Sequence, residues 1–573
     1  MRHIVWLVWA LAALGCDDAA PEQATGGESD AARAGDQGGA QLAWDAGAGF
    51  GGEGGFGGEF GGAGGAGGGG GGGAADAGPP APGGNTNINL GGSQDLGYFR
   101  RLLEDGIVPT SDDFEAAGFF AEHHTPLPEP DCGERVCVQA MLGVMGNLIN
   151  GNNCTLLQIG LNSPIVADPR NRPPLNLSVV VDVSGSMAES GKLEFVRQGL
   201  DRMVDALRDD DQVALITYSS EARVLFEMQA LRDTRSDLAF FIRGLQPEGA
   251  TNIFDGLELG YHESLRSYDS GRQNRLIFLS DGNATAGNTD SGAIMEMSRV
   301  YNSEGVGITT VGLGTDFNHT LMRGIAEQGD GNYYFVEDAA AVDEVFSQEI
   351  SYFTVPVAFD LELELSAGSD YRFVRAYGSS FWEDTEAGGQ LSVPSVFLAH
   401  RVAHDDVEPG GGRRGGGSAL LIELMPTAEP DERAEGEARV AEITARFREP
   451  GTNRIVEAQV PVLYPGLPWE LRREGFFDNT IVEKSFVMLN IYVGLVTAVD
   501  LWHFERQREQ AMAVLLRLIA AVEDYEDSAH GGRGDVDMQL DVELMEQLLS
   551  VMRQNGAPEP ADEPIPEDPW PAD

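Results

Sequence analysis

The sequence contains little cysteine, little positive charge and no internal hydrophobic run long enough to cross a bilayer. Its 573 residues include four cysteines, and 91 acidic side chains outnumber 38 basic ones, which gives a formal net charge of −53. Such a chain would repel nucleic acids and anionic membrane surfaces, so both are excluded as partners. The most apolar internal stretch, residues 486–499, is interrupted by Asn490 and is shorter than a membrane-spanning helix. We expect it to form a buried helix.

The cysteines indicate one disulfide in an oxidising compartment. Cys132, Cys137 and Cys154 lie close together in the sequence, and their spacing matches no zinc-binding pattern. Three pairings are open, and each leaves one free thiol.

The N-terminus has the pattern of an export signal. Arg2 precedes an apolar stretch at residues 4–14, which is too short to span a bilayer but suits a secretory signal. Residues 13–16, Ala-Leu-Gly-Cys, resemble a bacterial lipobox, although Ala13 stands where leucine is usual. The resemblance implies cleavage before Cys16 and a lipid on that cysteine, and hence a bacterial cell-envelope protein at either face of the outer membrane. The alternative is an ordinary secreted protein with a chance cysteine.

Composition divides the chain into seven segments. A long region rich in Gly, Ala, Asp and Glu cannot bury enough apolar surface to fold, and it predicts a disordered tether between the anchor and the folded part. The expected order is a signal peptide at 1–16, the tether at 17–92, an accessory segment at 93–171, an α/β domain at 172–350, a β-rich domain at 351–475, a helical region at 476–555 and an acidic, Pro-rich disordered tail at 556–573.

Residues 172–350 alternate between strand-like and helix-like patterns. Short runs rich in Val, Ile and Leu occur at residues 175–181, 213–218, 276–279 and 308–312, as expected for strands that are buried on both faces. A helical stripe follows the first run, and residues 222–227 are expected to pair antiparallel at the sheet edge. The predicted fold class is α/β, with a doubly wound, mostly parallel sheet followed by an antiparallel β unit and a C-terminal helical segment.

Oxygen-bearing side chains follow the strands of this predicted sheet. Asp182, Ser184 and Ser186 come directly after the strand predicted at residues 175–181, and Asp281 follows the one predicted at residues 276–279. Thr251 lies in a loop before a helix. Ligands of doubly wound sheets bind at the carboxyl ends of the strands, so these five residues are expected to meet there. An all-oxygen set with no His or Cys predicts a divalent cation, Mg²⁺ foremost, with Ca²⁺ or Mn²⁺ as alternatives.

These motifs resemble the von Willebrand factor type A (VWA) domain. That family carries a metal-ion-dependent adhesion site (MIDAS) with the pattern Asp-x-Ser-x-Ser, a later Thr and a later Asp, and all five positions are matched here in order. The resemblance implies that Asp182, Ser184, Ser186, Thr251 and Asp281 hold the cation directly or through water, and that an acidic group of a partner protein completes its shell. The arrangement also resembles bacterial envelope VWA lipoproteins of the YfbK type.

The resulting expectation is a non-enzymatic, lipid-anchored binding protein of the cell envelope. The alternative is a structural or assembly protein in which the metal only braces the fold, and partners use the β or helical units. Catalysis is disfavoured because the three loops carry no histidine as general base. His400 and His404 have helical spacing but lack the Glu of a zinc-protease motif. His123 and His124 are expected in a loop with no function.

Overall fold

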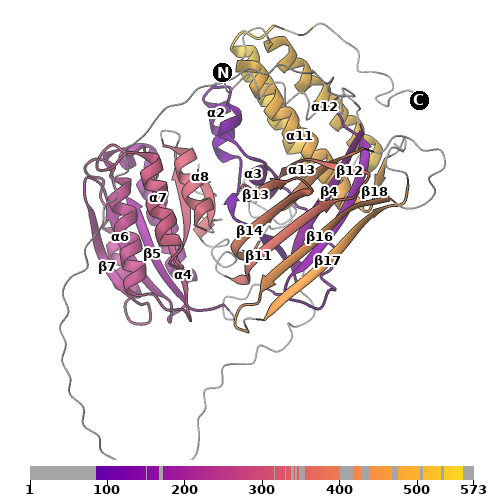
Figure 1. Cartoon of the computed structure of the whole chain (residues 1–573). Coiled ribbons are helices and arrows are strands. Elements are labelled where there is room, and N and C mark those ends of the chain that lie inside the picture. The colour runs from indigo at the N-terminus through magenta and orange to yellow at the C-terminus, as the bar shows by residue number, and fades with distance from the viewer. Residues whose placement is uncertain are drawn as a thin grey trace, which may run out of the picture. The chain divides into compact units, whose positions relative to one another are not determined.

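The computed structural model describes residues 86–560, apart from residues 150, 152, 167–171, 315–316, 330, 337–340, 342–344, 347–354, 400–416, 428–437, 453, 467–474, 504–506, 531–534 and 559. The signal peptide, Cys16, nearly all of the predicted tether, most of the acidic tail, His400 and His404 therefore lie outside the described residues. Within these limits the chain contains a mixed sheet with helices on both faces, a larger antiparallel sheet and a set of C-terminal helices (Figure 1).

The first sheet confirms the predicted doubly wound architecture. Its strand order is β2-β10-β9-β8-β5-β6-β7, and neighbouring strands are parallel except for β7, which pairs antiparallel with β6 at the edge, as predicted. The strands are β2 (Gly92–Ser93), β5 (Leu175–Asp182), β6 (Gln212–Tyr218), β7 (Ala222–Ala230), β8 (Gln273–Ser280), β9 (Gly307–Leu313) and β10 (Asn332–Val336).

Helices cover both faces of this sheet because its strands alternate between two apolar cores. Leu177 and Val179 of β5 pack with one group of helices, while Val180 faces the other group. The first group is α4 (Lys192–Ala206) and α5 (Arg235–Arg243), and the second is α6 (Ile253–Arg266), α7 (Ser291–Asn302) and α8 (His319–Gln328). The carboxyl ends of β5 and β8 consequently meet at one edge between the two helical layers.

The second sheet is antiparallel and larger than the β unit predicted over residues 351–475. Its main path runs β12-β15-β4-β1-β14-β11-β16-β17, with β13 paired to β14 and β3 placed between β4 and β18. The strands are β1 (Thr86–Asn89), β3 (Cys137–Gly146), β4 (Asn153–Ser163), β11 (Pro356–Ala367), β12 (Tyr371–Tyr377), β13 (Trp382–Thr385), β14 (Gly388–Leu398), β15 (Ala419–Pro426), β16 (Ala438–Arg448), β17 (Ile455–Tyr464) and β18 (Phe476–Phe477).

Four of these strands, β1, β3, β4 and β18, lie outside the β unit predicted over residues 351–475. Residues 86–89 were assigned to the disordered tether, but they form β1 between β4 and β14. Most of the apolar stretch at residues 138–148, inside the accessory segment predicted over 93–171, forms β3, which pairs with β4. These strands were not predicted because their backbone hydrogen-bond partners lie far away in the sequence, where a local pattern does not reveal them.

The C-terminal helices pack with the first helices of the described chain. Residues Phe99 and Phe119 belong to the same apolar cluster as Phe486 and Leu515. The helices are α2 (Gly97–Glu104), the short helices η1 (Ser111–Asp113) and α3 (Ala116–Ala121), then α11 (Thr480–His503), α12 (Arg508–His530) and α13 (Val536–Gln554). Among the described helices, α11 is long and apolar enough to cross a membrane, but 78% of its most apolar stretch is buried inside the protein. It is the buried helix expected at residues 486–499.

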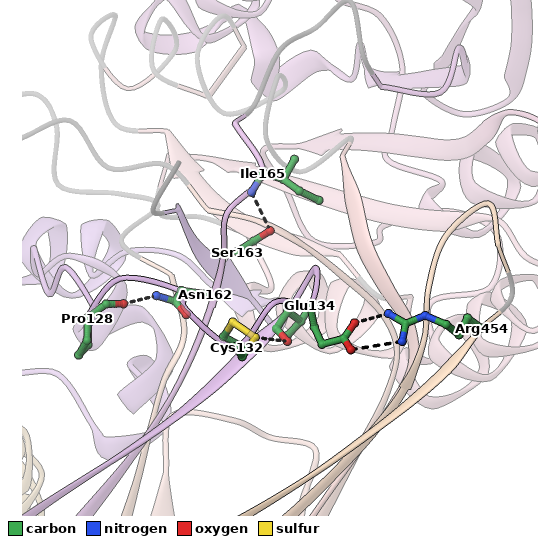
Figure 2. Close-up of a disulfide and its surroundings, with 9 residues drawn as sticks. Pro128, Cys132, Glu134, Asn162, Ser163, Ile165 and Arg454 are labelled. Atoms are coloured by element: carbon green, nitrogen blue, oxygen red, sulfur yellow. Dashed lines mark hydrogen bonds and ion pairs between the residues drawn. A yellow bond between two sulfur atoms is a disulfide. The ribbon is translucent and has the colours of Figure 1, made fainter. Parts of the chain in front are cut away.

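The disulfide joins Cys132 to Cys137 at the start of β3 (Figure 2). Cys154 is buried and takes no part in a disulfide. Beside the disulfide, Glu134 forms an ion pair with Arg454, which lies between β16 and β17, and Asn162 donates a hydrogen bond to the Pro128 carbonyl at 2.6 Å. The bridge therefore fixes the entry of the chain into the antiparallel sheet.

Candidate metal centre

The turn that follows β5 holds a carboxylate in a fixed position. Asp182 is the last residue of β5, and its Oδ1 accepts a 2.7 Å hydrogen bond from the backbone N–H of Ser184. Ser184 then caps the short helix η2 (Gly185–Gly191) with an extended backbone. Asp182 is 0% exposed and Ser184 is 1% exposed. The local chain thus orients this carboxylate through its own backbone.

Hydroxyl groups connect this turn to the end of β8. The Ser184 and Ser186 hydroxyl oxygens lie 3.0 Å apart, and the Ser186 hydroxyl donates to Asp281 Oδ1 at 2.8 Å. In the other direction, the Ser280 hydroxyl donates to Asp182 Oδ2 at 3.1 Å. The parallel register of β5 and β8, in which Val181 lies opposite Leu279, brings the two loops to the same edge.

Thr251 reaches the same place from the loop before α6. Its backbone N–H donates to the Thr285 hydroxyl at 2.9 Å, and its carbonyl accepts from the Thr285 N–H at 2.9 Å. A Cβ placed on Gly282 would lie 3.6 Å from Thr251 Oγ1 and 3.8 Å from Ser186 Oγ, so both hydroxyls border this glycine. All five residues predicted from the sequence therefore lie together at one edge of the sheet.

The two carboxylates at this site are buried, which makes their negative charge costly. Asp182 and Asp281 are both 0% exposed, and unpaired buried carboxylates are costly. Burial, together with the nearby Asp281 carboxylate, raises the pKa of Asp182 to about 6, although hydrogen bonds from Ser184 and Ser280 lower it. The pair of aspartates therefore favours a positive charge in its vicinity.

One positive charge is supplied by the chain itself. Lys192, at the start of α4, places its Nζ 2.8 Å from Asp281 Oδ2. Sequence reasoning missed this residue because it reads as the first turn of an amphipathic helix. Ser280 and Thr285, which orient Asp182 and Thr251, were missed as well. Their signal in the sequence is only their position beside predicted ligands.

The donor set fits a hard divalent cation. Two carboxylates and three hydroxyls offer only oxygen, which suits Mg²⁺, Ca²⁺ or Mn²⁺ better than soft metals. Within the described part of the chain, no three His, Cys, Asp or Glu side chains gather in a metal-binding arrangement. We call this edge of the sheet, with its five predicted ligands, the rim. Metal binding at the rim would depend on the serine and threonine hydroxyls, with Asp182 and Asp281 supplying the charge.

The structure assigns a packing role to one histidine that was expected to have none. His123 follows α3 in a loop, as predicted, but it is 0% exposed. Its Nε2 lies 2.7 Å from Asp541 Oδ2 on α13, and its Nδ1 lies 2.7 Å from the Phe119 carbonyl oxygen. The imidazole thus links the N-terminal segment to the C-terminal helices, a packing contact that the sequence pattern did not predict.

The sheet order, the two helical layers and the oxygen-rich rim define a doubly wound α/β domain with a polar edge at the ends of β5 and β8. A family model described as the von Willebrand factor type A domain matches residues 176–348. The chain therefore contains a VWA domain, as the sequence motifs predicted.

Two bacterial relatives support this assignment. YfbK from Escherichia coli is 29% identical over 194 residues, which are 34% of this chain and 34% of that protein. The protein sll0103 from Synechocystis is 29% identical over 181 residues, which are 32% of this chain and 42% of that protein. Both relatives are described as uncharacterized, and the matches span less than half of their length. A solved VWA protein from Catenulispora acidiphila is 13% identical, with a TM-score of 0.43 over 68% of this chain and 87% of that one.

Proposed function

We propose that the VWA domain binds a divalent cation, Mg²⁺ foremost, and through it an acidic side chain of a protein partner. The observation that carries this proposal is the convergence of Asp182, Asp281 and the three hydroxyls at one rim, although they come from three separate loops. Both carboxylates are buried and oriented by hydrogen bonds, so little reorganisation is needed on binding. When bound, the cation would supply an electrophilic centre that attracts a further carboxylate oxygen.

The residues at the rim would contribute two kinds of ligand. Asp182 and Asp281 supply negative charge, and the hydroxyls of Ser184, Ser186 and Thr251 supply neutral oxygen ligands. Since hydroxyls add no charge, the negative charge of the protein ligands comes from the two carboxylates, and a bound cation would keep a coordination position for a further oxygen ligand. Ser186 is only partly buried and Gly185 is exposed, which leaves this side of the rim open to solvent.

We further propose that the protein is a binding protein of the bacterial cell envelope, anchored by a lipid on Cys16. Support comes from the apolar N-terminal stretch, the lipobox-like residues 13–16 and the long Gly-rich segment that follows. A tether is useful when one end is held, and it would present the VWA domain at a distance from the membrane. A binding role is favoured over catalysis because the three loops carry carboxylates and hydroxyls but no histidine.

The alternative is that the metal braces the fold while partners contact the antiparallel sheet or the helices. The hydrogen bond between Ser186 and Asp281 links two loops, and a cation held by the same residues would strengthen that link, as the bracing role requires. Affinity capture of envelope proteins on the full chain, with Mg²⁺ or with EDTA, separates the two. The adhesion proposal predicts partners that are lost in EDTA and recovered when Mg²⁺ is restored. Capture of the same partners in both conditions would support the bracing role and contradict adhesion through the metal.

A further inference from the structure

Lysine is nearly absent from this chain, and its two lysines occupy similar environments. Lys192 and Lys484 are the only lysines among the 38 basic Lys and Arg side chains. Their side chains are 11% and 15% exposed, and each ammonium contacts buried aspartate: Lys192 Nζ lies 2.8 Å from Asp281 Oδ2, and Lys484 Nζ lies 2.7 Å from Asp537 Oδ2. An ammonium is a compact point charge, whereas a guanidinium is a wide planar fork. Lysine is thus confined to two places where a small positive charge meets a buried carboxylate.

The path of the Lys192 side chain is closely confined. Its aliphatic stem passes Gly314, directly after β9, where a Cβ would come within 2.8 Å of Lys192 Cε. Gly314 also has a φ of +76°, which other residues rarely adopt. The backbone at this point therefore leaves room for the lysine stem, and the ammonium is directed at the rim.

Asp281 divides its two oxygens between two partners. Oδ1 accepts from the Ser186 hydroxyl at 2.8 Å, and Oδ2 accepts from the Lys192 ammonium at 2.8 Å. The oxygen that faces the hydroxyl set is thus distinct from the oxygen that faces the lysine. Lys192 can remain in contact with Asp281 while Oδ1 is used for another ligand.

We propose that Lys192 is a built-in counter-ion that weakens binding of the divalent cation and makes the loaded site select a carboxylate. This inference rests on the function proposed above. With Lys192, the two aspartates leave a net formal charge of −1 at the rim, so a divalent cation changes it to +1 and one added carboxylate neutralises it. Without Lys192, the loaded site would already be neutral and would have less attraction for an acidic group.

The two lysines allow a direct test in the unmodified protein. In the full chain labelled with ¹⁵N at lysine Nζ, the described contacts predict two buried ammonium signals, one from each lysine. Mn²⁺ bound at the rim should broaden the Lys192 signal far more than the Lys484 signal, because Lys192 contacts Asp281 of the rim and paramagnetic broadening falls steeply with distance. Equal broadening of both signals, or of neither when Mn²⁺ is bound, would overturn the proposal.

Substitutions test the charge itself. Lys192→Met removes the ammonium but keeps an apolar stem, and Lys484→Met is a matched control that removes the other buried lysine. In a calorimetric titration, Lys192→Met should bind Mn²⁺ at least about ten-fold more tightly than the wild type, whereas Lys484→Met should bind it with the affinity of the wild type. Unchanged or weaker binding by Lys192→Met would overturn the proposal. Lys192→Gln, which keeps a hydrogen-bond donor without the charge, replaces it if the methionine variant does not fold.

Acetate is the probe for the added carboxylate. Replacing chloride by acetate at equal ionic strength should tighten Mn²⁺ binding more in the wild type than in Lys192→Met. An equal effect in both proteins would overturn the selectivity assigned to Lys192. If the wild type itself binds neither Mn²⁺ nor Mg²⁺, the proposed function fails and this inference fails with it. If the wild type binds and the variant matches it, only this inference fails.

Discussion

Ser186 Oγ lies 2.8 Å from Asp281 Oδ1, although 95 residues separate these two residues in the chain. The contact forms because β5 and β8 are parallel neighbours, so the loops that follow them leave the sheet at the same edge. It brings the Asp-x-Ser-x-Ser turn and the later aspartate into one hydrogen-bonded group.

Asp182→Ala should remove the stabilisation of the protein by divalent cations. Cations that bind the folded state raise its stability by about 2.7 kcal/mol at a hundred times their dissociation constant. The wild type should therefore melt at a higher temperature with excess Mg²⁺ than with EDTA, as measured by differential scanning fluorimetry, while the variant should melt equally in both. Asp233→Ala, at an exposed aspartate of the same domain, is the control and should keep the Mg²⁺ response. Identical melting of the wild type in Mg²⁺ and EDTA would contradict a metal site at this rim.

Much of the rim could be predicted from the sequence because each of its parts is locally encoded. A buried apolar run ending in Asp182 indicates a strand end, and the same holds for the run before Asp281. Lys192 could not be assigned in this way, since its contact with Asp281 depends on how α4 begins relative to β8 and on the space beside Gly314. A local pattern contains none of these relationships.

The antiparallel sheet was harder to predict because its pairings are distant. β4 pairs with β15, and Leu156 lies opposite Glu423 far along the chain. β14 was not predicted at all, since it begins with two glycines and contains Pro394, which are poor strand formers. β11 follows a pattern that could be predicted, because its buried and exposed side chains alternate, whereas β15 is recognisable only as a short run rich in Leu and Ile.

Gly260→Ala should destabilise the VWA domain although alanine favours helices. A Cβ at this position on α6 would lie 2.5 Å from Val180 Cγ2 and 2.8 Å from Leu276 Cδ1, so the helix would have to move off the sheet. We expect a loss of about 1–3 kcal/mol in the free energy of unfolding, measured by urea denaturation. Gly324→Ala on α8 is the matched control: its nearest neighbour is the flexible end of Met295, so the change should be neutral or stabilising by up to about 1 kcal/mol. Equal effects of the two substitutions would refute the close approach of α6.

Glu327→Gln should stabilise the protein at alkaline pH. Burial and the nearby Glu115 carboxylate raise the pKa of Glu327 from 4.5 to about 8, against the opposing charge of Arg323. A carboxyl group whose pKa is raised by folding binds more protons in the folded state than in the unfolded state. The free energy of unfolding therefore falls as the pH rises from about 4.5 to 8. The variant lacks this ionisation and should be more stable than the wild type at pH 8.5 by on the order of 4 kcal/mol, with a much smaller difference at pH 5. Urea denaturation at both pH values measures this, with Glu304→Gln, at an exposed glutamate after α7, as the control. A difference that does not depend on pH would rule out this account.

Asp541→Ala should destabilise the helical region through His123. The two side chains are almost fully buried, and both ring nitrogens of His123 face acceptors, Asp541 Oδ2 at 2.7 Å and the Phe119 carbonyl at 2.7 Å. Removing the carboxylate leaves a buried imidazole without its partner, which should cost about 3 kcal/mol of unfolding free energy. Glu543→Ala, at an exposed position two residues later on α13, should cost less than about 0.5 kcal/mol. A double variant with His123→Ala isolates the pair: the two losses should be less than additive, because each substitution breaks the same contact. Full additivity would show that the pair does not connect the N-terminal segment to α13.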